Sequence, residues 1–140
     1  MKAVTTYLHF DGTCRQAMTF YQQCFGAELQ LNPYPDANGQ PSAEPDARIM
    51  HSQLLLDGPA FLMASDGPLN ASEMIQGTNF SVAVECSSMD EIERLFAAIG
   101  RNGKVWVSLT DVPWGARFGM LTDQFGTKWM FNYTLPPRNS

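Results

Sequence analysis

Two histidines are the side chains of this chain best suited to acid–base chemistry. His9 and His51 fall in two different segments that are predicted to be strands. Because an imidazole titrates near neutral pH, either could act as a general base on a small oxygenated substrate. Together with a carboxylate from Asp66 or Glu85, they could instead form a two-histidine, one-carboxylate metal site. The alternative for each is a hydrogen-bonded strand residue with no catalytic role.

Other side chains suggest ligand binding. Trp114 could stack on a ligand or fill the core. Arg117 could hold an anionic group or be a surface arginine that keeps its charge in water. Four methionines suit either an adaptable apolar pocket or ordinary core packing: Met63, Met74, Met120 and Met130.

The cysteines do not predict a disulfide framework or a metal site. Cys14, Cys24 and Cys86 are odd in number and form no CxxC pair. Free thiols in a reducing cytoplasm are therefore expected. Cys14 and Cys24 lie on the apolar side of a predicted helix, where a thiol acts as a small hydrophobic group.

Composition excludes several classes of partner. The chain has 140 residues, which suits a single domain with a substantial core. Its net charge is −5 and Lys and Arg do not cluster, so a nucleic-acid partner is not expected. No apolar run reaches membrane-spanning length, and the first residues lack the features of a signal peptide. A cytoplasmic protein is the expectation.

Two helices separate the predicted strands. The first runs over 14–25, with Thr13 and Gln16 as a capping box and Gly26 at its end. The second follows the capping box of Ser88 and Glu91 and stops at 100–103. Strands are expected at 4–10, 28–32, 48–56, 60–65, 79–85 and 105–109. The proline-rich segment 33–46 is either a flap over a site or a plain surface loop.

The chain closes with a predicted β-hairpin over 114–133, turning at 123–126. Gly126 supplies the positive φ of a tight turn, and Asp123 can accept hydrogen bonds from its own turn. Alternation predicts two faces for the last strand. One carries Trp129, Phe131 and Tyr133 for burial under a helix, and the other carries Lys128, Met130 and Asn132.

The two halves follow the same order of elements. Each reads strand, capped helix, then three strands, which predicts an α+β fold of two βαβββ modules. Curled mixed sheets would then surround a cleft, with the helices outside. We expect module 1 at 1–66, a connector at 67–77, module 2 at 78–135 and a short tail at 136–140.

This pattern resembles the vicinal oxygen chelate superfamily, which includes glyoxalase I, extradiol dioxygenases, and fosfomycin and bleomycin resistance proteins. The similar stretches are AMTFYQQCFGAEL after the first strand and LTDQFGTKWMFNY at the end. The opening YLHFDG and the stretch PWGARFGMLTDQFGTKW look like the PhnB-like branch, whose members often carry the name 3-demethylubiquinone-9 3-methyltransferase. The resemblance implies a homodimer.

The resemblance also places the ligands of metal-dependent members, commonly two His or Gln and a Glu. These positions fall at Thr5, Asn79 and Met130, which are poor ligands for a hard divalent ion. The resemblance therefore implies that no metal is held at the family's usual site. Methyl transfer has no support either, because no strand is followed by a glycine-rich loop that opens a helix.

The resulting expectation is a small-molecule-binding protein of the PhnB-like group whose reaction is unknown. Catalysis, if present, is assigned to His9 and His51. A drug-sequestering protein and a metal-dependent lyase, isomerase or dioxygenase with a rebuilt histidine site remain as alternatives. The expected ligand-binding residues are Tyr7, Asp66, Asn79, Trp114, Arg117, Met130 and Asn132.

Overall fold

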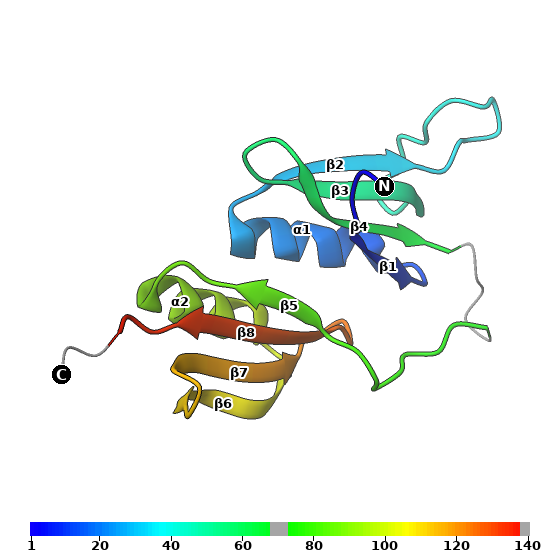
Figure 1. Cartoon of the computed structure of the whole chain (residues 1–140). Coiled ribbons are helices and arrows are strands. Elements are labelled where there is room, and N and C mark those ends of the chain that lie inside the picture. The colour runs from blue at the N-terminus through cyan, green and yellow to red at the C-terminus, as the bar shows by residue number, and fades with distance from the viewer. Residues whose placement is uncertain (68–72, 138–140) are drawn as a thin grey trace. The chain divides into compact units, whose positions relative to one another are not determined.

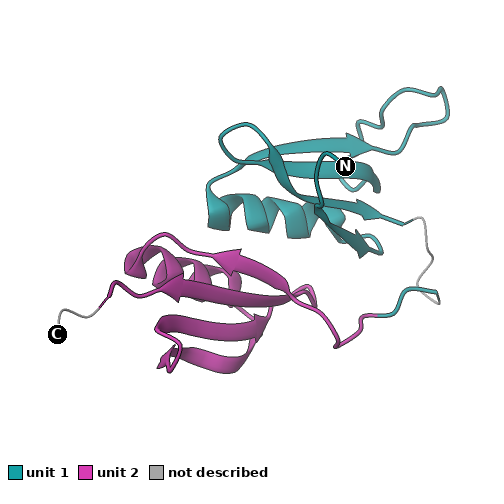
Figure 2. Cartoon of the chain, viewed as in Figure 1, with its two compact units in different colours: residues 1–75 teal, residues 76–140 magenta. Residues whose placement is uncertain are grey.

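A computed structural model describes residues 1–67 and 73–137. The chain divides into two compact units, Met1–Ile75 and Gln76–Ser140 (Figure 2). The boundary falls inside the predicted connector 67–77. Parts of that connector and of the predicted tail 136–140 lie outside the described residues.

Each unit is a βαβββ module (Figure 1). The first contains β1 (Thr6–Phe10), α1 (Cys14–Phe25), β2 (Glu28–Pro33), β3 (Ile49–Leu55) and β4 (Ala60–Asp66). The second contains β5 (Val82–Glu85), α2 (Met89–Ile99), β6 (Lys104–Val112), β7 (Ala116–Thr122) and β8 (Lys128–Thr134). The sheet orders are β1-β4-β3-β2 and β5-β8-β7-β6. In both, the first and last strands pair in parallel and the others antiparallel. The predicted α+β class with two mixed sheets is confirmed.

In the first module, α1 covers one face of the sheet and contacts β2, β3 and β4. Its buried side chains recur at helical spacing, so they form one stripe. Strand residues on the same face as this stripe are also buried, and each such side chain contributes about 1.5–3 kcal/mol to folding. The buried set comprises Leu8, Phe10, Cys14, Ala17, Met18, Tyr21, Cys24, Leu54 and Leu62.

In the second module, α2 packs on β8. The Phe96 ring meets the Phe131 ring edge-on, with centroids 5.6 Å apart. A Cβ atom added at Gly119 would lie 2.6 Å from Cε2 of Phe96. The glycine in β7 therefore lets the helix approach the sheet this closely. Trp129 and Phe131 are buried, as the alternation in the last strand predicts.

The two helix N-termini differ from each other. Ser88 Oγ accepts from the Glu91 N–H at 3.0 Å, which confirms that cap, while the Glu91 carboxylate accepts from the Ser87 N–H. The predicted capping box at Thr13 is wrong, because the Thr13 side chain makes no capping hydrogen bond. Gly26 has φ 66° and closes α1 as predicted.

Some strand bounds also differ from the prediction. β5 begins at Val82, so Asn79 precedes the strand. β6 extends to Val112, well past the predicted end at 109, because its outer half pairs with β7. Within the loop 33–46, Pro35 and Pro41 form an isolated bridge around a turn in which Asp36 Oδ1 accepts from the Asn38 and Gln40 N–H groups.

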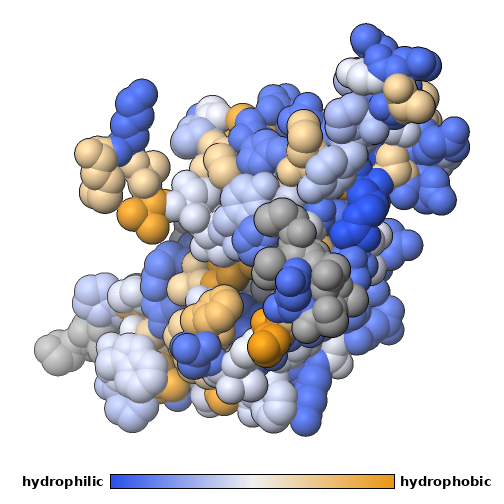
Figure 3. Space-filling view, turned by 90° about the vertical axis from the view of Figure 1, so that its right-hand side faces the viewer, coloured by the Kyte–Doolittle hydropathy of each residue, from blue (hydrophilic) through white to orange (hydrophobic). Residues whose placement is uncertain are grey.

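Hydrophilic residues dominate the face drawn in Figure 3, with smaller hydrophobic patches between them. Neither helix of the described chain has the length and apolar character needed to span a membrane.

Candidate functional site

The face of the first sheet opposite α1 carries polar side chains. Directly paired residues on neighbouring strands share a face. Tyr7 pairs with Met63, which pairs with Gln53. His51 pairs with Asn32 on β2, and His9 pairs with Ser65 on β4. We call this surface the open face of the first module.

Three of these residues form a cluster. Tyr7 Oη lies 3.0 Å from His51 Nδ1, within hydrogen-bond distance. The Tyr7 ring centroid is 5.1 Å from that of His9 and 5.7 Å from that of His51. Tyr7 therefore contacts both histidines that the sequence singles out. The fold brings them onto one face, and we refer to the three residues as the histidine cluster.

The His9 ring is oriented by the backbone. Its Nδ1 lies 3.0 Å from the Gly67 carbonyl, which also accepts from Ser65 Oγ at 2.9 Å. A carbonyl only accepts, so Nδ1 carries the proton of this hydrogen bond. In the neutral imidazole, Nε2 then holds the lone pair. Because His9 is exposed, that nitrogen is suited to accept a proton from a bound molecule.

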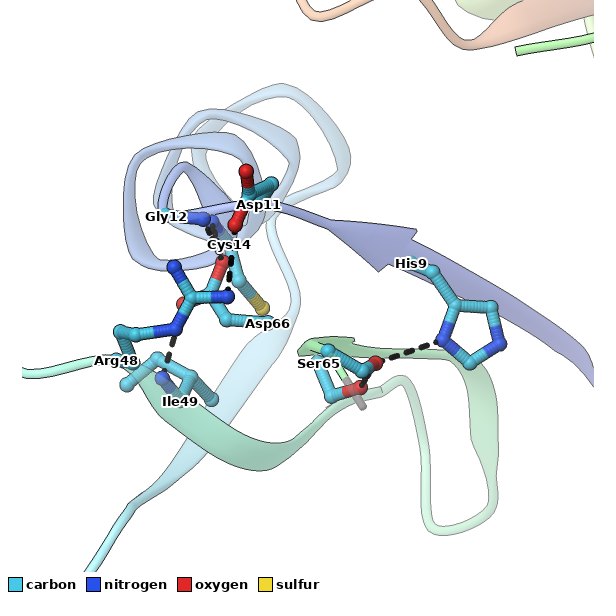
Figure 4. A network of polar contacts seen from close by, with 9 residues as sticks. His9, Asp11, Gly12, Cys14, Arg48, Ile49, Ser65 and Asp66 are labelled. Carbon is cyan, nitrogen blue, oxygen red and sulfur yellow. Dashed lines mark hydrogen bonds and ion pairs between the residues drawn. The ribbon is translucent and has the colours of Figure 1, made fainter. Parts of the chain in front are cut away.

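Asp66 does not belong to the histidine cluster. It pairs with Phe10, so its side chain is on the helix side of the sheet and is 2% exposed. Its Oδ1 accepts from the N–H groups of Gly12 and Cys14 at 2.8 and 3.0 Å. Its Oδ2 accepts from the Ile49 N–H at 2.9 Å. Figure 4 shows the carboxylate among these groups and apart from His9.

This arrangement corrects two sequence predictions. Asp66, which we expected to bind ligand, instead caps α1 in place of Thr13. It also ties the start of β3 to the helix. Next to it, Arg48 and Asp11 form an ion pair at 2.9 Å. All three of these hydrogen bonds to Asp66 come from backbone N–H groups, so we assign it a structural role.

The second module has a pocket on its own open face, with a volume of about 350 Å³. Three of its residues are predicted ligand-binding residues: Trp114, Met130 and Asn132. The Trp114 side chain is 68% exposed and meets the Phe118 ring edge-on. Asn132 Nδ2 donates toward the Glu85 carboxylate, 3.2 Å from each oxygen. We call this the Trp114 pocket. Its other lining residues are Ala83, Val84, Glu85 and Phe118.

Arg117 and Asn79 do not join this pocket. Arg117 pairs with Tyr133 on the helix side, where Nε donates to Asp111 at 2.9 Å and Nη1 to Glu93 at 2.8 Å. The hydrogen bond with Asp111 is the main cause that raises the pKa of the guanidinium above its usual value. These contacts join Arg117 to α2 and β6, and the expected anion-binding role of Arg117 stays a prediction.

Comparisons with known proteins agree with the observed fold. The family model described as 3-demethylubiquinone-9 3-methyltransferase matches residues 2–131. The chain belongs to this family. It is the PhnB-like branch of the vicinal oxygen chelate superfamily.

Several family relatives cover nearly the whole chain. Protein YjdN of Escherichia coli (strain K12) is 29% identical over 92% of this chain and 93% of its own length. The crystal structure of protein PA1353 from Pseudomonas aeruginosa is 35% identical, with a TM-score of 0.78 and coverage of 97% and 100%. The PhnB protein from Bacillus cereus is 26% identical, with a TM-score of 0.75 and coverage of 94% and 99%.

Among residues 1–67 and 73–137, no three His, Cys, Asp or Glu side chains are close enough together to hold a metal ion. The histidine cluster offers two imidazoles and a phenol, while the nearby carboxylate of Asp66 points to the other face. This donor set does not fit a divalent metal that needs a carboxylate, and we derive no step through one.

The thiols of Cys14 and Cys86 are not suited to nucleophilic chemistry. Burial raises the pKa of Cys14 to about 11, and the pKa of Cys86 is likewise about 11. Since the thiolate is the reactive form, both are inert near neutral pH. None of the three cysteines forms a disulfide.

Sequence reasoning missed Phe118 as a pocket residue. The register of the closing hairpin places it opposite Asn132. Counting outward from the turn at Asp123–Gly126 would have found it, because cross-strand partners share a face.

Proposed function

We propose that this chain binds a small oxygenated molecule on the open face of its first module. The observation that carries the proposal is the histidine cluster: Tyr7 Oη lies 3.0 Å from His51 Nδ1. The phenol and the two imidazoles offer both donors and acceptors on a face that α1 does not cover. Polar groups grouped in this way, beside Met63, are typical of ligand recognition.

Within this proposal, His9 is the general base if the protein is an enzyme. The Gly67 carbonyl holds Nδ1–H, so Nε2 of the neutral ring can take a proton from a substrate carbon or hydroxyl. Tyr7 can donate its hydroxyl proton toward a developing oxyanion. We do not propose methyl transfer. The two four-stranded mixed sheets of the described residues are unlike the doubly wound parallel sheet on which nucleotide-type cofactors bind.

A drug-sequestering role is the second candidate. The Trp114 pocket favours it, because an exposed indole and the Met130 side chain suit a flat apolar ligand. In that case the histidines would contribute little to binding, and the second module would contribute most.

The test is a proton–carbon NMR titration of the histidine rings with catechol and with glycolate as probes. We expect the His9 and His51 signals to shift. His9→Ala should weaken binding roughly tenfold, as expected for loss of one hydrogen bond to a polar ligand, with the fold intact. Gln16→Ala, on the exposed side of α1, is the matched control. Unchanged histidine signals at saturating concentrations of both probes would contradict the proposal.

Elemental analysis separates the metal-dependent alternative. Protein purified without an affinity tag should carry well under one metal ion per chain, even after incubation with zinc or iron(II). Near-stoichiometric metal that disappears in His9→Ala and in His51→Ala would replace our proposal with a metal-dependent one.

We further propose a cytoplasmic homodimer. Three cysteines that form no disulfide are typical of a reducing compartment. The dimer follows from the resemblance to its superfamily.

A further inference from the structure

A second pocket of about 410 Å³ lies in the second module. It shares no residue with the Trp114 pocket and lies entirely within one compact unit. Its volume is in the usual range for small-molecule sites. We call it the Trp106 pocket, and it is lined by Thr78, Ser81, Trp106, Met120, Leu121 and Lys128.

Two lysines flank one threonine at this pocket. Thr122 pairs with Lys104 on one side and with Lys128 on the other, so the three residues form a row across β6, β7 and β8. These are two of the three lysines in the chain. Among the described residues, neither forms an ion pair. In a chain of net charge −5, a pair of cations without carboxylate partners is an unusual local excess of positive charge.

The Trp106 indole is fixed in place beside this row. Its Nε1–H donates to Thr122 Oγ1 at 2.8 Å. The Lys104 ammonium lies 3.9 Å from the ring centroid, over one face. Trp106 lines the pocket, whereas Lys104 does not. An indole held at both its N–H and its face is preorganised for stacking.

Two of the lining residues, Thr78 and Ser81, lie in the segment before β5, and this segment is anchored to the second module. Gln76 Nε2 donates to the Phe125 carbonyl at 3.1 Å, which attaches the segment before β5 to the hairpin turn. This contact anchors the segment that contains Thr78, which lines the pocket together with Ser81. The pocket thus combines an apolar floor at Met120 with the hydroxyl-bearing residues Thr78 and Ser81 and with Lys128.

We infer that the Trp106 pocket binds a small molecule with an aromatic body and a carboxylate. The aromatic body would stack on Trp106 and rest on the apolar floor. The carboxylate would accept a charge-assisted hydrogen bond from Lys128 Nζ and further hydrogen bonds from the two hydroxyls. The Lys104 ammonium, which lies over one face of the indole, adds electrostatic attraction for the carboxylate. This inference stands independently of the histidine cluster.

The test compares 2-naphthoate with its neutral isostere 2-naphthamide by calorimetry on the full chain. We expect 2-naphthoate to bind at least about tenfold more tightly, the usual effect of one charge-assisted hydrogen bond. Lys128→Met should abolish this preference, and Lys128→Arg should restore most of it. Lys2→Met is the matched control, since it removes the same charge at the N-terminus.

NMR locates the probe. The indole N–H signal of Trp106, assigned from its absence in Trp106→Phe, should shift on adding 2-naphthoate, while that of Trp114 should not. Three results would overturn the inference: no binding in the millimolar range, equal affinity for the two probes, or a full preference retained by a folded Lys128→Met variant. A shift of the Trp114 signal alone would also overturn it.

Discussion

At the scale of single residues, each module contains one buried aspartate that holds backbone in place. Asp66 accepts from three backbone N–H groups in the first module. In the second, Asp123 Oδ1 accepts from the Phe125 and Thr127 N–H groups, and Oδ2 accepts from Trp129 Nε1 at 2.8 Å. Hydrogen bonds to a charged acceptor are among the stronger ones, so these carboxylates contribute to folding more than to chemistry.

We predict that Asp66→Ala lowers the free energy of unfolding by on the order of 4 kcal/mol, because three N–H groups lose their acceptor. Asp66→Asn should cost less, since the amide oxygen still accepts. Urea denaturation monitored by circular dichroism measures both. The exposed-loop variant Asp46→Asn is the control and should change stability by less than about 0.5 kcal/mol. An Asp66→Ala variant as stable as this control would contradict the structural role.

The burial of Cys14 limits the stability of the native state at alkaline pH. Burial is the largest cause that raises its pKa, from 9.0 to about 11. The native state therefore disfavours the thiolate, and the stability from this group is complete below pH 9 and is lost as pH rises through 11. Between these pH values, wild-type protein should lose roughly 2 kcal/mol more than Cys14→Ala. Urea denaturation across the range is the measurement, and parallel curves would contradict the prediction.

At the scale of elements, the two helices begin with different kinds of cap. Ser88 caps α2 locally, whereas α1 depends on a carboxylate from β4. Ser88→Ala should therefore cost about 1 kcal/mol. Thr13→Ala should cost much less, because its side chain makes no capping hydrogen bond. Thermal or urea unfolding of the two variants side by side tests this, and equal losses would show that the distinction is false.

The same contrast shows what the sequence could predict of the elements. Periodicity and turn residues located both helices, the glycine that ends α1 and the turn at Asp123–Gly126. The cap of α1 could not be predicted, because its acceptor stands in β4, far along the chain. The ion pair of Arg117 could not be predicted for a similar reason: strand alternation gives two faces but does not say which one the Glu93 carboxylate on α2 will occupy.

At the scale of the whole molecule, the proposed dimer is directly measurable. Light scattering after size exclusion should give twice the chain mass of 15.6 kDa. The mass should be constant over a wide concentration range if the interface is of the size that supports a stable dimer. A mass of 15.6 kDa at every concentration would contradict the proposal.

The candidate sites were predictable only in part. Sequence alternation put His9 and Tyr7 on one face of a strand, but only the pairing of β1 with β4 and β3 brings His51 to Tyr7. Nothing in the sequence indicated the row of Lys104, Thr122 and Lys128, because it depends on the register of three strands. Local patterns specify faces, whereas sites depend on which strands become neighbours.

The closing hairpin bears on what a shared family name implies for such proteins. Within LTDQFGTKWMFNY, Asp123 and Gly126 shape the turn and Trp129 fills the core. These three residues of the stretch thus hold the turn and the sheet together. Two chains that share this stretch are expected to share the fold of the hairpin, and they can still differ in the ligands that they bind. Similarity over this stretch therefore indicates architecture, whereas the reaction depends on residues elsewhere in the chain.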